Sequence, residues 1–158
     1  MRRPRRLRRP PPRGHPPGVR GAPRVQGAIR LLLDTHVLLW YITADPKLPA
    51  TFRAAIQDPG NEVYLSVASV WEAVIKHGLG KLPLPGPPAD YLPQQRDAHG
   101  IASLPVDEGA MPPLARLPPL NRDPFDRLLV AQALQHGLTV ATVDPDVAAY
   151  AIPLLPTA

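Results

Sequence analysis

The stretch IRLLLDTHVLLWYI, residues 29–42, decides the fold that this sequence predicts. Residues 29–33 form a short apolar run, which is typical of a strand buried between two layers of helices. The run ends at a carboxylate, Asp34, and residues 35–42 then predict a helical turn. A charged side chain directly after a buried strand indicates a loop at the carboxyl end of that strand.

Beyond this stretch, strand patterns continue to alternate with helical patterns. Further strands are expected at residues 63–66, 101–104 and 138–142, and further helices at 49–57, 67–77, 91–99, 108–116, 126–136 and 146–150. Ser66 is expected to cap one helix that stops at Gly78, and Gly137 to end another. Parallel strands need crossovers, which are usually helical, so the sequence predicts a single α/β domain with a mostly parallel sheet sandwiched between helices.

The formal net charge of +5 comes from one end of the chain. Residues 1–28 contain nine of the 18 basic residues and no acid, so residues 29–158 hold nine basic and 13 acidic residues, a net charge of −4. We expect residues 1–28, rich in Arg, Pro and Gly, to be a disordered tail and residues 29–155 to be the domain. The tail is interpreted either as a basic arm that binds nucleic-acid phosphates or as sequence upstream of a true start at Val19 or Val25.

The composition also excludes several classes of protein. The chain contains no cysteine, which excludes a disulfide framework, a thiolate zinc site and a thiol nucleophile. Its longest apolar run, residues 37–42, is far shorter than the roughly 18 apolar residues of a membrane span, and no apolar signal segment follows the basic start. We therefore expect a cytoplasmic protein that does not contact membranes.

Two carboxylates follow predicted strands, and two lie in predicted helices. Asp34 and Asp144 come after the strands at 29–33 and 138–142, where a loop cap is the structural alternative to a functional role, and Thr142 could supply a hydroxyl contact. Glu72 lies among the small residues Ala68, Ser69 and Ala73, which allow close approach of another element, although a helical glutamate is normally solvated.

The segment Asp123-Pro124-Phe125-Asp126 opens the helix predicted at 126–136. Capping explains Asp123 fully, with Pro124 in the first turn. It explains Asp126 only in part, because a helix N-terminus also leaves such a carboxylate available to a cation. We therefore assign Asp123 to structure and Asp126 to chemistry, and we interpret Asp146 as the N-cap of the last helix.

Acids from four separated segments repel one another if they converge, unless divalent cations neutralise them. An all-oxygen ligand set suits Mg²⁺ or Mn²⁺, and such ions activate water for phosphodiester cleavage. The hypothesis from these residues is that Asp34, Glu72, Asp126 and Asp144 form one metal site. The histidines His15, His36, His77, His99 and His136 are scattered, which argues against a zinc hydrolase.

Four segments together resemble the PIN-domain VapC-type toxins. They are LLLDTHVLLWYI (31–42), SVWEAVIKHGLGKL (69–82), RDPFDRLLVAQAL (122–134) and TVD (142–144). The resemblance covers roughly residues 29–153 and implies an endoribonuclease in which Asp34, Glu72, Asp126 and Asp144 bind Mg²⁺ or Mn²⁺. The long Arg-rich tail departs from the family pattern, in which the domain usually begins close to the first strand.

The resemblance also implies partners: a small cognate antitoxin that covers the site, a second copy of the chain in a homodimer, and transfer or ribosomal RNA as substrate. Arg127 and an apolar groove near Trp40 and Trp71 could contact the antitoxin, although both tryptophans are more often core residues. The alternative is a non-catalytic module that binds an antitoxin, or RNA through the tail, and in which the acids serve as helix caps.

Overall fold

The computed structural model describes residues 27–158, so most of the predicted Arg-rich tail lies outside the described residues. The centre of the fold is a sheet of four parallel strands in the order β3-β2-β1-β4. The strands are β1 (Arg30–Leu33), β2 (Glu62–Ser66), β3 (Ala102–Leu104) and β4 (Thr139–Ala141). The prediction of a parallel α/β sheet is confirmed.

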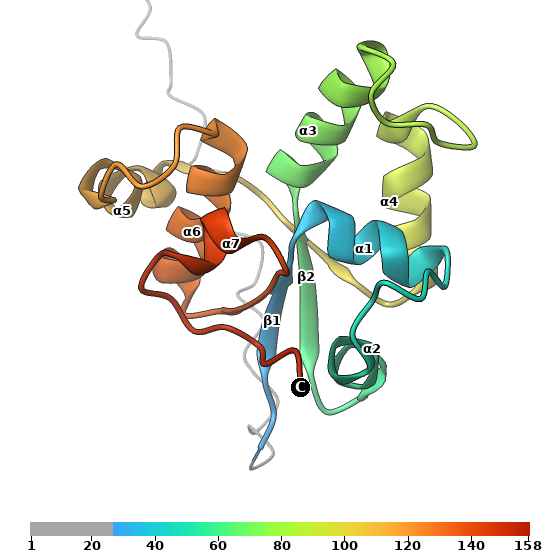
Figure 1. Ribbon diagram of the computed structural model, residues 1–158, viewed down its shortest axis with the longest axis horizontal. Helices are drawn as coiled ribbons and strands as arrows, with labels where there is room; N and C mark the ends of the chain where they lie inside the picture. The colour runs from blue at the N-terminus through green and yellow to red at the C-terminus, as the bar shows by residue number, and fades with distance from the viewer. Residues whose placement is uncertain (1–26) are drawn as a thin grey trace, which may run out of the picture.

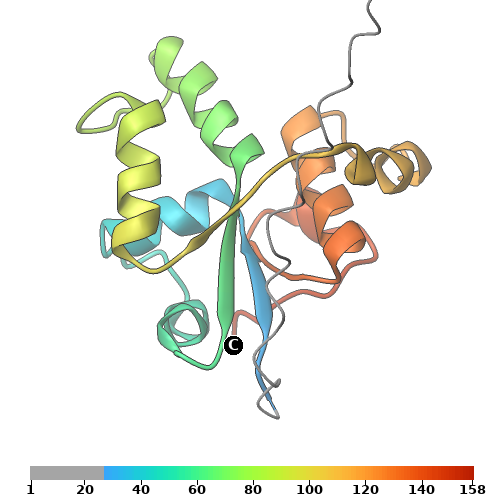
Figure 2. The same ribbon diagram turned by 180° about the vertical axis from the view of Figure 1, so that it is seen from behind.

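Helices cover both faces of the sheet, as Figures 1 and 2 show. One side carries α1 (Thr35–Ile42), α2 (Ala50–Gln57) and α4 (Pro88–Ala98), and the other carries α5 (Met111–Arg116), α6 (Pro124–His136) and α7 (Pro145–Ala148). The helix α3 (Val67–Gly78) continues from the end of β2, and a 3-10 turn (Glu108–Ala110) precedes α5. The segment that leaves β3 crosses the sheet to reach α5 (Figure 2).

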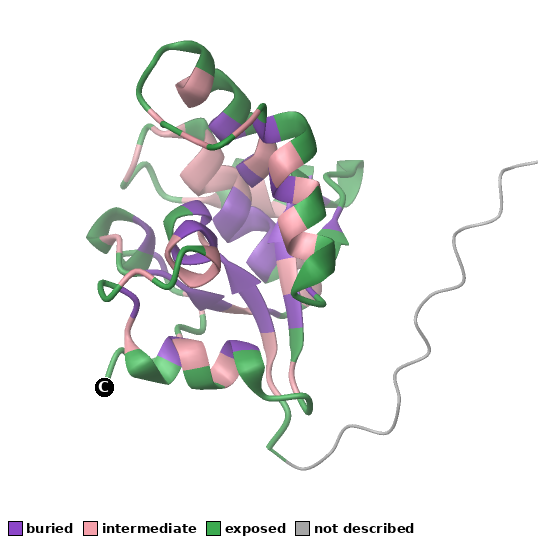
Figure 3. Ribbon diagram, turned by 90° about the vertical axis from the view of Figure 1, so that its right-hand side faces the viewer, coloured by how far each residue is buried: buried purple, intermediate pink, exposed green. Residues whose placement is uncertain are grey.

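Alternation along β1 divides the core into two clusters. Leu31 and Leu33 pack with Phe52 and Leu92 on the α1, α2 and α4 side, whereas Leu32 packs with Val130 on the α6 side. Side chains on a strand point alternately to opposite faces, so the run of three leucines fills both layers. Figure 3 shows most of β1 and the end of β2 as buried and the outer helix faces as exposed.

The register brings three strand ends together. Leu33, the last residue of β1, pairs with Leu65 on β2 and with Ala141 on β4. The outer edge of β4 is covered by the C-terminal segment, because Val140 donates to Pro153 O at 2.9 Å and accepts from Leu155 N at 2.9 Å. The side chains that follow Leu33 and Ala141 therefore start from neighbouring positions.

Two helices differ from their predicted bounds because of proline. The helix predicted at 91–99 begins at Pro88, since proline is well suited to the first turn, where its missing N–H is not needed. The helix predicted at 108–116 divides into a 3-10 turn and α5, which has Pro112 and Pro113 in its first turn. These prolines cannot donate the hydrogen bonds that would extend a single α-helix from Glu108.

The helix ends predicted at Ser66 and Gly137 are confirmed, and the one predicted at Gly78 is wrong. Ser66 accepts a hydrogen bond from Ala68 N, and Gly137 ends α6 with a φ of 65°. Gly78, however, stays within α3, and it is Gly80, two residues later, that adopts a positive φ of 71°. Glycine tolerates this left-handed conformation, so the turn after α3 uses the second glycine of the pair.

Among residues 27–158, the helices are too short and too polar for any of them to cross a membrane.

Candidate metal centre

Asp34 is held at the junction of β1 and α1. Its Oδ1 accepts a hydrogen bond from Thr35 N at 2.7 Å, and its Oδ2 accepts one from the Thr142 hydroxyl at 2.7 Å. Its own N–H donates to Ala141 O at 3.0 Å. Burial raises the pKa of Asp34 above its ordinary value and the negative charge of Glu72 adds to this, while the hydrogen bonds from Thr142 and Thr35 oppose it.

Thr142 links the ends of β1 and β4. Its buried hydroxyl donates to Asp34 Oδ2 and accepts from Asp144 N at 3.0 Å. Asp144 in turn caps α7, since its Oδ1 accepts from Asp146 N at 2.9 Å. The expected hydroxyl contact of Thr142 is confirmed. The interpretation of Asp146 as the N-cap is wrong, because the N-cap is Asp144, two residues earlier, and the helix begins at Pro145.

Asp34 and Asp144 do not hold equivalent positions relative to their strands. Asp34 follows β1 directly, and the register places Thr142 at the matching position after β4. Asp144 lies two residues further along the chain. The two acids are therefore joined through one threonine hydroxyl rather than by direct symmetry of the strand ends.

The N-terminus of α6 carries the next two acids. Asp123 is its N-cap, as predicted, and its Oδ1 accepts from Phe125 N at 2.8 Å and from Asp126 N at 3.2 Å. Asn121 accepts from Asp123 N at 2.8 Å and donates to Asp126 Oδ2 at 2.9 Å. The turn before α6 thus holds both carboxylates in place.

Asp126 is the acid with the most perturbed ionisation. Its pKa is raised from its ordinary value to about 6, mainly by burial and in smaller part by the charges of Asp123, Asp34 and Asp144, while the amide of Asn121 opposes the shift. A like charge disfavours an ionised carboxyl only over short distances. The causes of this pKa shift therefore indicate that acids from three separate elements lie near one another.

Glu72 approaches the same region from α3. It is 6% exposed and shares the buried face of this helix with Ala68, Ser69 and Ala73. Its Oε2 lies 3.1 Å from Lys76 Nζ, one helical turn later. Small neighbours let α3 pack closely, as predicted, so the glutamate is buried and not solvated.

Carboxylate oxygens of Glu72, Asp123 and Asp126 all lie within 4.8 Å of one another. Asp34 is near enough to raise the pKa of Asp126 and to have its own pKa raised by Glu72, and Asp144 also acts on Asp126. The structure thus brings the four predicted acids to the carboxyl end of the sheet. It adds Asp123, whose cap uses Oδ1 only in the hydrogen bonds described, so the same residue can cap α6 and face the cluster.

This donor set fits a hard divalent cation. The ligands are carboxylate oxygens, which Mg²⁺ and Mn²⁺ prefer, and an oxygen from each of three acids can reach one point. Within residues 27–158, Lys76 makes the one ion pair to this cluster. A cation would relieve the repulsion and desolvation that raise the pKa of Asp34 and Asp126.

Sequence reasoning missed two contributors. Asp123 was assigned to structure alone because capping accounts for it completely, and only the spatial arrangement shows its nearness to Glu72. Asn121 attracted no notice, yet it fixes both Asp123 and Asp126. An asparagine two residues before a capping aspartate is the one signal that could have indicated it.

The residues proposed for antitoxin contact have divergent environments. Trp40 packs against the core, whereas Trp71 is 54% exposed and contacts Phe125 edge to face, with ring centroids 4.8 Å apart. The alternative interpretation of the tryptophans as core residues therefore holds for Trp40 and not for Trp71. Arg127 donates to Pro118 O and to the Tyr150 hydroxyl, so its guanidinium serves a contact within the domain.

Comparison with known proteins adds a family and several relatives. The profile of the PIN domain matches residues 31–153. A segment of 55 residues is 47% identical to Ribonuclease VapC16 of Mycobacterium tuberculosis (strain ATCC 25618 / H37Rv). That match spans 35% of this chain and 39% of the relative, so it covers well under two thirds of the relative's length.

Solved structures share the fold. The chain matches a structure of VapBC2 from Rickettsia felis bound to a DNA fragment from its promoter, with a TM-score of 0.60 and 13% identity over 80% of this chain and 97% of that one. It also matches FitAcB from Neisseria gonorrhoeae, with a TM-score of 0.50 and 26% identity over 80% and 97% of the two chains. At 13% identity, the similarity to the VapBC2 structure shows the fold alone.

Proposed function

Because this chain belongs to the PIN-domain family, we propose that it is the toxin of a toxin–antitoxin pair, an Mg²⁺- or Mn²⁺-dependent endoribonuclease that hydrolyses RNA phosphodiester bonds. The resemblance of four segments to VapC-type toxins supports this assignment. So does the local identity of 47% to a protein named as a VapC ribonuclease. The activity, the RNA substrate and the antitoxin are parts of the proposal.

The single observation that carries the proposal is the convergence of Glu72 and Asp126. Asp34, Asp123 and Asp144 each cap a helix, so their positions have a structural explanation. Glu72 and Asp126 cap nothing, yet they bring carboxylate oxygens within 4.8 Å of each other and of Asp123. Burying a carboxylate beside other carboxylates costs several kcal/mol of folding free energy unless a cation compensates the charge.

Each side chain has a distinct role in this proposal. Glu72, Asp123 and Asp126 would hold the cation, and Asp34 and Asp144 would complete its surroundings. Thr142 orients Asp34, and Asn121 orients Asp126. When bound, Mg²⁺ or Mn²⁺ lowers the pKa of a bound water and polarises a phosphate oxygen.

RNA must approach a strongly acidic end of the domain. The described acids there outnumber Lys76, their one paired cation, so binding of a polyanion should depend on divalent cations that offset this charge. Sequence-specific recognition of RNA usually targets unpaired loops, whose backbone can enter such a site. We therefore propose a loop of transfer or ribosomal RNA as substrate.

The antitoxin and a second copy of the chain are the proposed protein partners. α3 carries exposed apolar side chains on one side, a pattern that marks interaction surfaces. They are Val67, Trp71, Val74 and Ile75, and Leu79, directly after the helix, is exposed as well. The same helix contributes Glu72, so a protein bound there would lie beside the acidic cluster.

The second candidate is a non-catalytic module that binds an antitoxin, or RNA through residues 1–28. It is favoured by the capping roles of Asp34, Asp123 and Asp144, which need no metal. It leaves the convergence of Glu72 and Asp126 unexplained, since neither caps a helix and each has a partner of its own, Lys76 and Asn121, that does not require the two carboxylates to meet.

The test is incubation of antitoxin-free protein with total RNA in Mg²⁺ or Mn²⁺, beside an EDTA sample and an Asp126→Asn variant shown to be folded by circular dichroism. Asparagine keeps an oxygen that can accept the hydrogen bond from Asn121. We expect cleavage that EDTA and the substitution both abolish. Metal-loaded, folded protein that leaves several structured RNAs intact would favour the binding module instead.

A further inference from the structure

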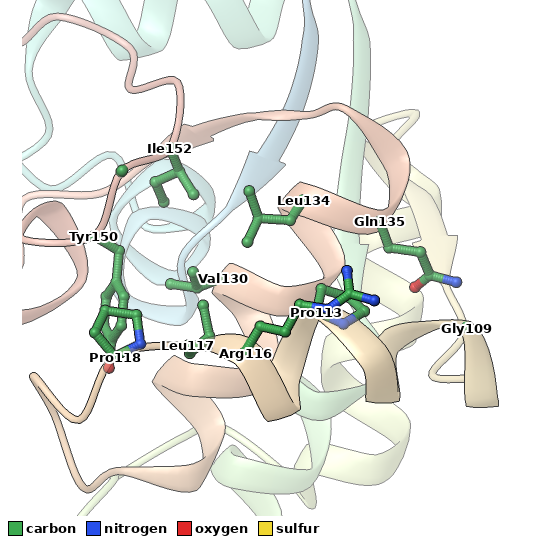
Figure 4. A pocket seen from close by; sticks show the side chains of 11 residues that line it. Gly109, Pro113, Arg116, Leu117, Pro118, Val130, Leu134, Gln135, Tyr150 and Ile152 are labelled. Atoms are coloured by element: carbon green, nitrogen blue, oxygen red, sulfur yellow. The ribbon is translucent and has the colours of Figure 1, made fainter.

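A pocket of about 530 Å³ lies on the α6 side of the sheet (Figure 4). Its walls come from α5, α6 and the segment after α7, and none of the clustered acids lines it. Its volume is within the range of roughly 300–1,000 Å³ that is usual for small-molecule sites. The pocket therefore has the size of a ligand site separate from the candidate metal centre.

The lining of the pocket is mostly apolar, and its polar side chains are Arg116, Gln135 and Tyr150. Leu117, Val130, Leu134 and Ile152 surround the space in Figure 4, with Arg116 on the α5 side. Arg116 is exposed and forms no ion pair with any of residues 27–158. Leu134 is 44% exposed, so this apolar wall is open to an incoming molecule.

We propose that this pocket binds a small apolar carboxylate, whose body packs on Leu117, Leu134 and Ile152 and whose anionic group pairs with Arg116. The planar guanidinium matches a carboxylate in a bidentate geometry. A compact space bounded by three elements suits a small molecule better than an extended peptide. This part of the inference does not depend on the nuclease activity.

One arginine connects the pocket wall to the acidic end. Arg127 Nη1 donates to Pro118 O at 3.0 Å and to the Tyr150 hydroxyl at 3.2 Å, and both residues line the pocket. The same nitrogen lies 3.4 Å from Asn121 O, at the limit of a hydrogen bond. Asn121 then donates to Asp126 Oδ2 at 2.9 Å.

A ligand that fills the pocket would stabilise Tyr150 and the loop at residues 117–121 in the arrangement described. That arrangement presents Asn121 to Asp126, so pocket occupancy should strengthen metal binding at the acidic end. By linkage, the metal should strengthen ligand binding by the same factor. This coupling rests on the proposed metal site, whereas ligand binding itself does not.

Binding is tested on the full chain by ¹H–¹⁵N NMR titration with 4-phenylbutyrate, and with 4-phenylbutanamide as the uncharged analogue. We expect shifts centred on Leu117, Leu134 and Ile152, with affinity about tenfold weaker for the amide and for Arg116→Gln. Arg53→Gln, on α2, is the matched arginine control and should bind as the wild type does.

Equal affinity for the two probes, or an Arg116→Gln variant that binds normally, would overturn the carboxylate assignment. Absence of shifts at millimolar probe would overturn the site as a whole. If the chain elutes as a dimer and the probe causes shifts only after dilution to the monomer, a second copy of the chain occupies this surface. That result would also contradict the proposal.

Coupling is measured as Mn²⁺ affinity by electron paramagnetic resonance with and without saturating 4-phenylbutyrate. We expect affinity to rise about fivefold, the lower end of typical allosteric coupling. Tyr150→Phe keeps the ring but removes the hydroxyl, so it should bind the probe and lose the coupling. If the probe leaves the Mn²⁺ affinity of the wild type unchanged, the coupling through Arg127 and Asn121 is refuted. If the wild type binds the probe but binds no Mn²⁺, the proposed metal site is refuted and the proposed pocket is not.

Discussion

Charged side chains are arranged differently at the two ends of β1 and β2: they are paired at one end and clustered with like charges at the other. At the start of β1 and β2, Arg30 and Glu62 are paired in register, with Arg30 Nε 3.1 Å from Glu62 Oε2, and the Tyr64 hydroxyl donates to the same oxygen. At the other end, acids from β1, α3, α6 and the end of β4 converge, and Lys76 is their one paired cation among the described residues.

This difference separates a structural charge from a functional one. Glu62 is 44% exposed and has its counter-charge within the sheet, so it gains nothing from a bound ion. The acids at the carboxyl end are partly or fully buried, and burial together with mutual repulsion raises the pKa of Asp34 and Asp126. A cluster that the chain itself does not neutralise is suited to an external cation.

The largest effect on RNA cleavage is expected when one glutamate at each end of the sheet is replaced by glutamine in separate variants. We expect Glu72→Gln to reduce RNA cleavage at least about a hundredfold, because it removes a direct metal ligand where changes in outer-shell partners alone cost roughly 10–100-fold. Glu62→Gln makes the same chemical change on β2 and should leave cleavage unaltered. Initial rates at saturating Mg²⁺ provide the measurement.

Calorimetric titration of both variants with Mg²⁺ or Mn²⁺, beside a check of their folding, distinguishes loss of a metal ligand from misfolding as the cause of reduced cleavage. If Glu72→Gln folds and binds the ion with wild-type affinity, Glu72 is not a ligand. Equal losses in the two variants would remove the distinction between the two ends.

A second prediction concerns the stability of the metal-free protein as a function of pH. The pKa of Asp126 in the folded chain, about 6, lies above the value of about 3.9 for an unfolded aspartate. A raised folded pKa contributes stability that is fully present below the unfolded value and is lost as the pH rises through 6. Without metal, Asp126→Asn should therefore match the wild type near pH 3.5 and melt at a higher temperature above pH 6.

Metal should narrow that difference in stability. An ion at 100 times its Kd stabilises the folded state by about 2.7 kcal/mol, and only protein that binds it benefits. With saturating Mg²⁺ at pH 7.5, we expect the wild type to gain melting temperature and Asp126→Asn to gain little. Thermal scans at fixed ionic strength test this, and a similar gain in both proteins would argue against Asp126 as a ligand.

A smaller effect is expected from the threonine that supports the cluster. Thr142→Val removes the hydroxyl that donates to Asp34 Oδ2 and accepts from Asp144 N. Metal affinity should fall about tenfold, the lower range for loss of an outer-shell partner. Thr139→Val, at the start of the same strand, is the control, and equal affinities of the two variants would show that Thr142 does not position the site.

Much of this arrangement could be predicted from sequence because it depends on local pattern. The run at residues 29–33 indicated a buried strand, and Ser66 and Gly137 marked helix ends through capping preferences that act over a few residues. Parallel strands bring their carboxyl ends to one edge of the sheet, which is enough to expect Asp34 and Asp144 at the same edge but does not place Glu72 and Asp126, which lie on helices. These inferences needed only periodicity and topology.

What sequence could not supply is the position of one side chain relative to another across the fold. Asp123 is fully explained by its cap, and its nearness to Glu72 depends on how closely α3 and α6 pack. The exposure of Trp71 likewise depends on which side of α3 meets the sheet, and a lone tryptophan usually indicates core. Choosing between Gly78 and Gly80 as the helix stop required the actual length of α3.

The smallest effect should lie at the opposite end, in the stability of Glu62→Gln. Its pair with Arg30 is solvent-exposed, and such pairs contribute roughly 0.2–1 kcal/mol. Glutamine keeps an oxygen that can accept from Tyr64 and Arg30, and Arg30 retains its bond to His136 O at 2.9 Å. We expect urea denaturation to show a loss below about 1 kcal/mol that shrinks at high salt, where such charges are screened. A larger loss that salt does not reduce would mean that this end of the sheet, like the acidic end, depends on one particular carboxylate.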